Sequence, residues 1–397
     1  MYLSKIHIQN IKSLEDVTWE MEDIQQAPGW HVILGNNGSG KTTFVRSVAL
    51  ALVGHKEAGA LRQNWSDWLR QGPARGTINL TIISDSFYDR SISFNIPEGQ
   101  ATVKFRRNQN GYVSFDMQDE PSSLIDLVRD SIFQGWFSAS YGPYRRFSGG
   151  DQDYEKMFYS NPRLAPHLSA FGESVALTEV VEWLKGLRFK ELENSSSNES
   201  TLLKKIIAFV NHEGFLPNHT SLERVSSKGV HFKDGTGCDI EVDDLSDGYR
   251  SILSMTFELI RQMSNAYTGT DIFSTNRTQI IVPGVVLIDE VDAHLHPSWQ
   301  RQIGHWFRRH FPKVQFIVTT HSPLVCQAAS TVFVLPNPGS QGSGSFVTGT
   351  DLDRLRYGNI LEAYSTEAFG SSATRSQESQ QRMERLAELN IEEMSRE

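Results

Sequence analysis

Three features are scarce in this sequence of 397 residues. There are only two cysteines, Cys238 and Cys326, and their spacing suggests no pairing, so we expect two buried thiols in a reducing compartment rather than a disulfide. Long apolar runs are missing, since the longest, Ile280–Ile288, is interrupted by Pro283 and Gly284. A basic excess is also missing: the formal net charge is -9, so any contact with nucleic acid must use a local patch.

These absences narrow the class of protein. The amino-terminal residues MYLSKIHIQN do not resemble a secretory leader, and with no membrane-spanning run we expect a soluble, cytoplasmic chain. Hydrophobic residues make up 39% of the chain, which is enough to build a sizeable core. The length suits one elaborated domain.

Hydrophobic periodicity changes along the chain. Strand-like patterns occur around residues 5–9 and 30–34, and a helical pattern follows at 42–53. Residues 76–115 alternate in the manner of an antiparallel β meander. Two helical patterns flank a polar run at 194–200. Short apolar runs at 285–288 and 316–318 are typical of strands buried in a parallel sheet. We therefore divide the chain into a first lobe, a helical insertion, a second lobe and a helical tail, at residues 1–150, 151–240, 241–360 and 361–397.

The segment Gly35–Thr42 reads GNNGSGKT and matches the phosphate-binding pattern G-x-x-x-x-G-K-[ST] between a predicted strand and helix. Its glycines let backbone N–H groups and the helix N-terminus face an anion. Lys41 is expected to reach the β and γ phosphates, and the Thr42 hydroxyl to bind Mg²⁺. The predicted nucleotide contacts here are Asn36, Asn37, Gly38, Ser39, Gly40, Lys41, Thr42 and Thr43.

A second pattern places two carboxylates at the end of an apolar strand, in the run Val285–Glu290. Asp289 is expected to hold Mg²⁺, and Glu290 to orient and deprotonate a water in line with the γ-phosphate. An apolar run followed by Asp-Glu can also be an ordinary solvated strand end. The phosphate-binding loop favours the catalytic interpretation.

Two further segments indicate the subclass. Leu245–Tyr249 reads LSDGY and looks like the signature L-S-x-G-x of ABC-type ATPases, in which Ser246, Asp247 and Gly248 would meet the γ-phosphate bound to the opposite subunit. His321 ends the apolar strand VTTHSP in the manner of the switch histidine that senses the γ-phosphate. Four such motifs in this order make coincidence a poor explanation.

The whole chain resembles prokaryotic SMC-like and RecF-like ABC ATPases, and in particular the ATPase part of OLD-family proteins and of antiphage systems such as Septu. Supporting segments are residues 8–14, 141–146 and 292–297. The resemblance implies an α/β P-loop NTPase head of the ABC type, with a parallel core sheet, an antiparallel meander and an inserted helical subdomain. It also implies ATP and Mg²⁺ as cofactors, hydrolysis in a head-to-tail dimer, and a D-loop in which Asp292 contacts the partner subunit.

The chain departs from the broader ABC pattern at the Q-loop and at Asp247, which replaces the middle glycine of the strict signature. No glutamine stands at the strand end at Tyr141, where a Q-loop glutamine is expected, and Gln134 lies several positions earlier. Lys12 matches the basic residue that reaches the nucleotide in relatives, although a surface lysine is the simpler interpretation. The residues to which we assign catalytic roles are Lys41, Glu290 and His321.

Three functions compete beyond ATP turnover. The first is a regulatory subunit of an antiphage complex: the 76 residues after His321 (397 − 321) are too few for a TOPRIM domain, so an HNH or TOPRIM nuclease or another effector would be a separate chain. The alternative is a RecF-like DNA repair ATPase that binds DNA directly through basic clusters at 104–107, 145–146 and 308–309. A transporter or translation-factor cassette ranks last.

Overall fold

The computed structural model describes most of the chain, and the described ranges are 1–61, 63–91, 97–116, 133–143, 161, 163–172, 179–216, 219–227, 229–241, 244–245, 247–340, 342–370, 378–379, 381–383 and 385–386. The basic pair at 145–146 and most of the predicted tail helix lie outside these ranges. No helix among the described residues is both long and apolar enough to cross a membrane.

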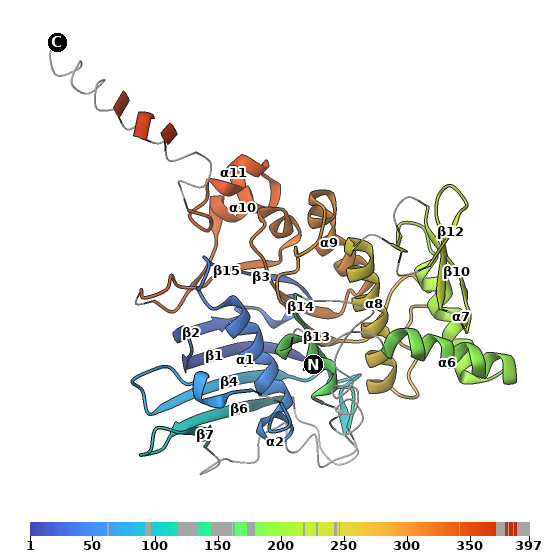
Figure 1. The fold of residues 1–397 in the computed structure, drawn as a ribbon, viewed down its shortest axis with the longest axis horizontal. Coiled ribbons are helices and arrows are strands. Elements are labelled where there is room, and N and C mark those ends of the chain that lie inside the picture. Colours follow the sequence, from blue (N-terminus) through green and yellow to red (C-terminus); the bar gives the residue numbers. More distant parts are fainter. Residues whose placement is uncertain are drawn as a thin grey trace.

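The amino-terminal third of the chain forms a five-stranded antiparallel sheet (Figure 1). In spatial order its strands are β2 (Leu14–Glu20), β1 (Tyr2–Ile11), β4 (Arg75–Ile83), β6 (Glu98–Arg107) and β7 (Val113–Phe115). Alternation decides which side chains face inward: Ile6 and Ile8 are fully buried, whereas Lys5 and His7 on the same strand are partly exposed. The predicted meander is confirmed, and the first two strands of the chain extend it.

A six-stranded sheet forms the second layer and carries the candidate site. Its order is β16 (Ser345–Phe346), β15 (Thr331–Val334), β3 (Gly29–Leu34), β14 (Val314–Thr319), β13 (Gly284–Ile288) and β9 (Ser138–Tyr141). All neighbours pair in parallel except β15 and β16. Every residue of β3, β13 and β14 is buried, as the near-continuous apolar runs predict.

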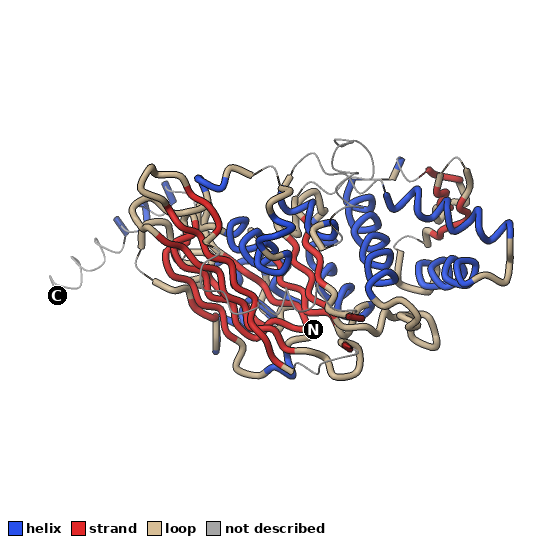
Figure 2. The backbone as a smooth tube through the Cα atoms, turned by 90° about the horizontal axis from the view of Figure 1, so that it is seen from below, coloured by secondary structure: helices blue, strands red, loops and turns tan. Residues whose placement is uncertain are grey.

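Helix α1 (Lys41–Val53) packs between the two sheets, where strands and helix form adjacent layers (Figure 2). Ile33, Leu287 and Ile317 face α1 and the antiparallel sheet. The two sheets are also joined directly: the buried Gln315 side chain accepts from the Leu3 N–H at 2.7 Å and donates to the Leu3 carbonyl at 2.9 Å. This pair of hydrogen bonds satisfies an amide that would be costly to bury alone.

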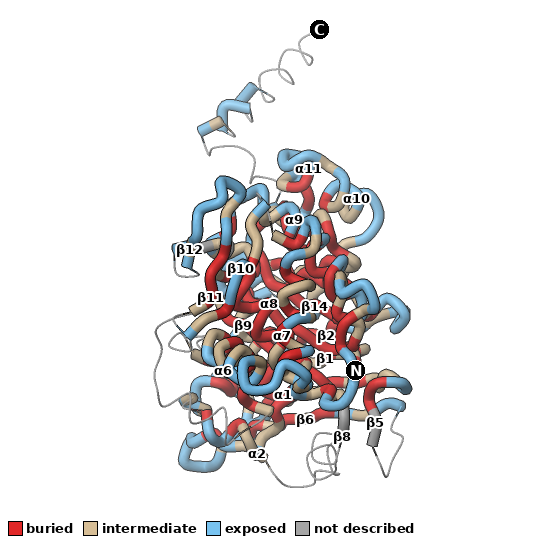
Figure 3. The backbone as a smooth tube through the Cα atoms, turned by 90° about the vertical axis from the view of Figure 1, so that its right-hand side faces the viewer, coloured by how far each residue is buried: buried red, intermediate tan, exposed pale blue. Residues whose placement is uncertain are grey.

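The opposite face of the parallel sheet is covered by helices and short turns, namely α8 (Asp247–Ala266), α9 (Pro297–His310) and the 3-10 helix η5 (Pro323–Ala328). The chain continues into α10 (Gly349–Tyr357) and α11 (Ile360–Tyr364), whose outer residues are exposed (Figure 3). Trp30, Val286 and Phe316 point into this second core. The three central strands β3, β13 and β14 thus contribute side chains to both cores.

The inserted segment begins with two helices, as its two helical patterns predict. They are α6 (Glu179–Glu193) and α7 (Asn198–Val210), and the Ser197 side chain caps α7 by accepting the Ser200 N–H at 3.0 Å. A three-stranded antiparallel sheet follows, made of β10 (Ser221–Val225), β11 (Val230–Lys233) and β12 (Asp239–Glu241). The insertion is therefore α/β rather than helical throughout.

Shorter elements complete the described fold. They are α2 (His55–Ala58), α5 (Leu168–Phe171), β5 (Arg90–Ser91), β8 (Phe133–Gln134) and the 3-10 turns η1 (Ile24–Gln26), η2 (Trp65–Asp67) and η3 (Ala165–His167). Both cysteines are free thiols, as expected, and Cys326 is buried. The expectation of a second buried thiol is wrong, because Cys238 lies in an exposed hairpin turn between β11 and β12.

Helix α9 approaches the sheet closely at Gly304. A Cβ built there would lie 2.6 Å from the Ala328 Cβ and 2.9 Å from the Trp30 Nε1. We predict that Gly304→Ala lowers the free energy of unfolding by about 1–3 kcal/mol, because overpacking outweighs the helix propensity of alanine. Gly186, in the middle of α6, is the matched control: a Cβ at that position would meet nothing within 4 Å, so Gly186→Ala should stabilise by about 0.5–1 kcal/mol. Urea unfolding measures both, and a stabilising Gly304→Ala would contradict this packing.

Candidate functional site

The phosphate-binding loop joins the carboxyl end of β3 to the start of α1, as predicted. Gly38 and Gly40 have φ values of 80° and 97°, in the left-handed region that favours glycine. A Cβ on Gly40 would also lie 2.7 Å from the Leu14 Cδ2 and 2.6 Å from the Ser13 Oγ. The turn between β1 and β2 therefore packs against the loop and requires glycine at this position.

Two polar groups inside the loop are arranged around the place of an anion. Lys41 is buried and its ammonium donates to the carbonyls of Gly35 at 2.7 Å and Asn36 at 3.2 Å. The Ser39 hydroxyl is buried and has no hydrogen-bond partner in the described part of the chain. A buried hydroxyl without a partner is costly, and a phosphate oxygen would satisfy it.

The two carboxylates of the second motif lie where β13 ends, beside the end of β14. Asp289 is buried, and the Thr319 hydroxyl donates to its Oδ1 at 2.6 Å. The same hydroxyl accepts the Glu290 backbone N–H at 2.8 Å. Glu290 has a φ of 46°, a conformation that costs a non-glycine residue free energy and is typical of functional sites. One threonine thus fixes the carboxylate of Asp289 and the backbone of Glu290.

The residues after Glu290 are connected to the strand that carries His321. The Thr320 hydroxyl donates to the Asp292 Oδ1 at 2.5 Å and accepts the Ser322 N–H at 2.9 Å. The Ser322 hydroxyl donates to the Gln300 Oε1 at 2.7 Å. The predicted D-loop and the predicted switch histidine therefore sit on one hydrogen-bonded unit within a single chain.

These groups lie close enough to one another to influence each other's pKa. Burial lowers the pKa of Lys41, while Asp289, Glu290 and Asp292 oppose that shift. Burial also lowers the pKa of His321, Lys41 lowers it further, and the same three carboxylates oppose the shift. His321 is accordingly neutral near pH 7, and the structure brings together five of the residues predicted from separate motifs.

The charges of this cluster suit a nucleotide with its metal ion. Three carboxylates face one lysine and a neutral histidine, which leaves excess negative charge that would repel a bare polyphosphate. The Thr42 hydroxyl and the Asp289 carboxylate are oxygen ligands of the kind that Mg²⁺ prefers. No group of three or more His, Cys, Asp or Glu residues within the described ranges is arranged to hold a metal ion. Phosphate oxygens and water molecules would complete the coordination.

Among the other predicted site residues, Gly248 and Lys12 have described surroundings. Ser246 and the side chain of Asp247 are outside the described residues. Gly248, at the start of α8, lies against the predicted D-loop of its own chain, since a Cβ there would be 3.3 Å from the His294 carbonyl. Lys12 lies over the Trp68 ring, with 5.1 Å between its Nζ and the ring centroid. Burial and the nearby Arg46 lower the pKa of Lys12.

Tyr141 occupies the strand end where the family has its Q-loop glutamine. It ends β9 and pairs with Ile288, and its carbonyl accepts the Asp289 N–H at 2.8 Å. Its ring is buried, and burial followed by the charge of Glu258 on α8 raises the pKa of its hydroxyl. The backbone at this strand end supports the carboxylate motif, while the hydroxyl is directed into the α8 core.

Sequence reasoning missed three contributors to the site. Thr319 and Thr320 precede His321, and their role depends on the register between β13 and β14. The segment after β15 also lies beside the phosphate-binding loop: the Asn36 side chain donates to the Asn337 Oδ1 at 2.8 Å, and Pro338 lies 3.7 Å from a Cβ built on Gly38. The pair of threonines before the histidine was a visible signal, whereas Asn337 had none.

Comparison with known families agrees with this geometry. A family model described as an AAA domain matches residues 5–206, which is just over half of the chain. The chain belongs to this AAA-domain family. A second AAA-domain model, whose description mentions an AbiEii toxin and type IV toxin–antitoxin systems, matches residues 185–327. The two matches together include the phosphate-binding loop, the paired carboxylates and His321.

Two curated relatives come from bacterial systems. The Septu protein PtuA of Bacillus mycoides (strain KBAB4) is 26% identical over 335 residues, an alignment that spans 81% of this chain and 38% of that protein. The chain thus corresponds to well under half of PtuA. The protein named "Retron Ec83 probable ATPase" of Escherichia coli is 23% identical over 406 residues, spanning 84% of this chain and 71% of that protein. The predicted resemblance to the Septu protein is therefore confirmed.

A solved structure supports the fold independently. The SMC head bound to the C-winged helix domain of ScpA superposes with a TM-score of 0.54 at 16% sequence identity, covering 88% of this chain and 98% of that chain. At this identity the likeness concerns the fold alone. The predicted ABC-type α/β head is therefore confirmed.

The bridging role of Thr319 leads to a test. Thr319→Val keeps the shape of the side chain but removes the hydroxyl, so Asp289 and Glu290 lose their shared anchor. We predict that the maximal ATPase rate falls by about one to two orders of magnitude while nucleotide affinity changes little, because misplaced catalytic groups slow the reaction step.

Thr319→Ser is the matched control and should restore most of the rate, since it returns the hydroxyl. Steady-state ATPase assays with a direct measurement of nucleotide affinity separate the two effects. Equal rates in the valine and serine variants would show that the hydroxyl has no role.

Proposed function

We propose that this chain is a Mg²⁺-dependent ATPase whose active site is completed by a second copy of itself and whose cycle controls a separate effector in antiphage defence. The observation that carries the proposal is the convergence of Lys41, Asp289, Glu290 and His321 on a phosphate-binding loop that contains a buried hydroxyl without a partner. Family membership supports ATP as the nucleotide.

Each residue has a task in the proposed reaction. Lys41 leaves the loop carbonyls and pairs with the β and γ phosphates, while the backbone N–H groups of the loop bind the same oxygens. Thr42 and Asp289 would hold Mg²⁺, which neutralises charge on the phosphates. Glu290 orients the attacking water and accepts its proton, and neutral His321 can donate a hydrogen bond to the γ-phosphate.

The second copy is proposed from the position of the signature. Gly248 begins α8, a helix of 20 residues, and lies beside the predicted D-loop of its own chain. In the proposed head-to-tail dimer, the signature of one copy meets the γ-phosphate held by the other, through Ser246, Asp247 and Gly248. Asp292 then lies at the dimer interface. Thr320 donates a hydrogen bond to Asp292 and directly precedes His321. A contact between the partner copy and Asp292 would therefore act on the strand end that carries His321.

The defence role rests on the relatives. The two curated relatives reported above are named as a Septu protein and as a retron ATPase, and both align with more than four-fifths of this chain. We propose that the chain works in the bacterial cytoplasm as the nucleotide-dependent subunit of such a system. Its effector, such as an HNH or TOPRIM nuclease, would be carried by a different polypeptide.

Removing the proposed base gives the first test of catalysis. Glu290→Gln keeps the size and hydrogen-bonding capacity of the side chain but cannot accept a proton. We predict a fall in ATP turnover of about a hundredfold or more, with ATP affinity retained. Turnover equal to that of the parent protein would eliminate the assignment of Glu290.

Mixing two inactive variants tests whether the site is shared. Lys41→Ala removes the phosphate contact within a chain, and Ser246→Arg blocks the signature offered to the partner. Each homodimer has two defective sites, whereas a mixed dimer has one intact site, built from Lys41 of one chain and Ser246 of the other. An equimolar mixture should recover about one quarter of the parental ATPase rate if chains exchange freely.

Two outcomes of the mixing experiment contradict the shared site. The first is full activity of Ser246→Arg alone. The second is a mixture no more active than its components, when mixed dimers have been verified by a tag on one variant.

The defence role is tested in cells. The complete native locus, transferred to a susceptible host, should lower the plating efficiency of at least one phage in a panel. The same locus with Lys41→Ala should lose that protection, because ATP binding is proposed to control the effector. Undiminished protection by the Lys41→Ala locus would separate ATP binding from defence.

A further inference from the structure

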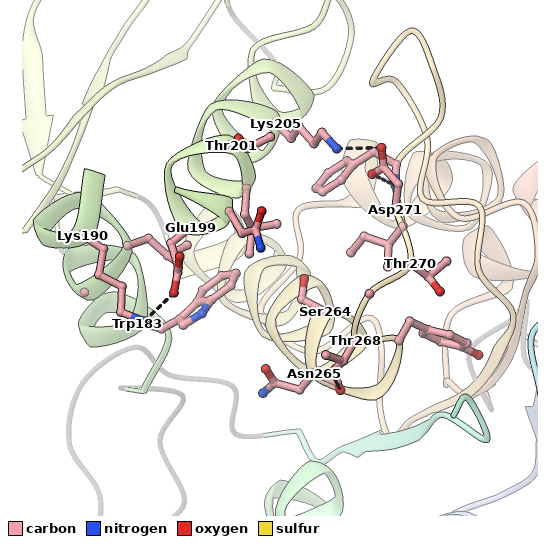
Figure 4. A pocket seen from close by; sticks show the side chains of 18 residues that line it. Trp183, Lys190, Glu199, Thr201, Lys205, Ser264, Asn265, Thr268, Thr270 and Asp271 are labelled. Carbon is pink, nitrogen blue, oxygen red and sulfur yellow. Dashed lines mark hydrogen bonds and ion pairs between the residues drawn. The ribbon is translucent and has the colours of Figure 1, made fainter. Parts of the chain in front are cut away.

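A pocket of about 730 Å³ lies far from the phosphate-binding loop in the sequence, between the inserted helices and the end of α8 (Figure 4). Its walls come from α6, from α7 and from the segment Ser264–Phe273. The volume is typical of sites for small molecules. Part of its lining belongs to the main hydrophobic core, namely Leu187, Tyr267 and Phe273.

The wall formed by α6 consists of Trp183, Gly186, Leu187 and Lys190. These residues are spaced i, i+3, i+4 and i+7, so they share one face of the helix. Trp183 is partly exposed and packs against the core along part of its surface. A Cβ at Gly186, one turn along the helix from Trp183, would meet nothing within 4 Å, so the helix surface is open there, and this open surface is called the slot.

The packing of the chain does not explain why residue 186 is a glycine. A glycine in the middle of a helix is destabilising relative to alanine. A Cβ at this position would meet nothing within 4 Å, so neighbouring atoms do not require glycine. What the glycine does preserve is this open slot on the helix face that also carries Trp183.

The other walls supply hydrogen-bonding groups. Asn198 and Thr201 on α7 and Ser264, Asn265 and Thr268 at the end of α8 line the pocket with amides and hydroxyls. Figure 4 labels Thr201, Ser264, Asn265 and Thr268 among the side chains that line the same pocket as Trp183. Such groups are suited to the heteroatoms of a polar ring system.

The charges at the pocket are already compensated. Lys190 pairs with Glu199 at 2.7 Å, and Lys205 pairs with Asp271 at 2.6 Å, both drawn in Figure 4. The lining therefore has no net charge. A highly charged polyphosphate would find no excess positive charge there, so such a ligand is disfavoured. An aromatic ring, neutral polar groups and an open slot favour an uncharged planar heterocycle.

We propose that this pocket binds a nucleobase, stacked on Trp183 in the slot left by Gly186, with its polar edge toward the amides and hydroxyls of α7 and α8. The base belongs either to a free nucleoside or to an unpaired position of a single strand, since both present the same ring. Aromatic stacking of this kind accepts any base and gives measurable affinity. The site is separate from the proposed ATPase centre and does not depend on it.

The test uses the full chain with Lys41→Ala as background, so that the phosphate-binding loop contributes little. Adenosine and a short single-stranded oligodeoxyadenylate are titrated by calorimetry. Trp183→Ala removes the stacking surface, and Gly186→Leu fills the slot without a helix penalty. Each should weaken binding by about tenfold or more. Leu192→Ala, an exposed residue on the same helix outside the pocket, should bind like the background protein.

The outcomes distinguish the sources of the base. Binding of adenosine alone assigns the site to a free nucleoside, and binding of the oligonucleotide alone assigns it to a single strand. Gly186→Leu also separates ligand binding from folding, because its thermal stability should equal or exceed that of the background. The proposal is overturned if neither probe binds up to millimolar concentration, or if either pocket variant binds with undiminished affinity.

Discussion

The Thr319 hydroxyl holds the candidate site together because it connects the ends of two parallel strands. It donates to Asp289 and accepts from the backbone of Glu290, so one side chain sets the carboxylate proposed to bind Mg²⁺ and the proposed base relative to each other. The parallel pairing of β13 with β14 and of β14 with β3 then brings this unit to the edge where the phosphate-binding loop begins. The strained backbone of Glu290 is maintained by the same anchor.

The side chains gathered at this edge of the sheet carry more negative than positive charge. Asp289, Glu290 and Asp292 face Lys41, and His321 is neutral. The Mg²⁺ that accompanies the nucleotide would offset the excess negative charge of these side chains. The hydrogen bond from Thr320 to Asp292 would connect the proposed dimer interface to the strand end that carries His321. In the proposed cycle, bound ATP serves mainly to join two copies of the chain.

Much of this could be predicted from the sequence, because its strongest signals are local. The loop residues Gly35–Thr42, the Asp289–Glu290 pair and His321 each follow an apolar strand, and parallel strands end at a common edge. The threonine pair before His321 was visible in the sequence, but the partners of Thr319 depend on strand register. The role of Asn337 could not be predicted, since it depends on a contact between residues 301 positions apart. The β-sheet of the insertion was missed because its strands are short, and Cys238 because an isolated turn gives no burial signal.

Whether two copies share the site can be decided by measuring the ATPase rate per chain over a wide range of protein concentration. If the signature of one copy completes the site of the other, the rate per chain should fall on dilution, in step with dissociation of the ATP-bound dimer seen by sedimentation. A rate per chain that stays constant while the protein becomes monomeric would contradict a shared site.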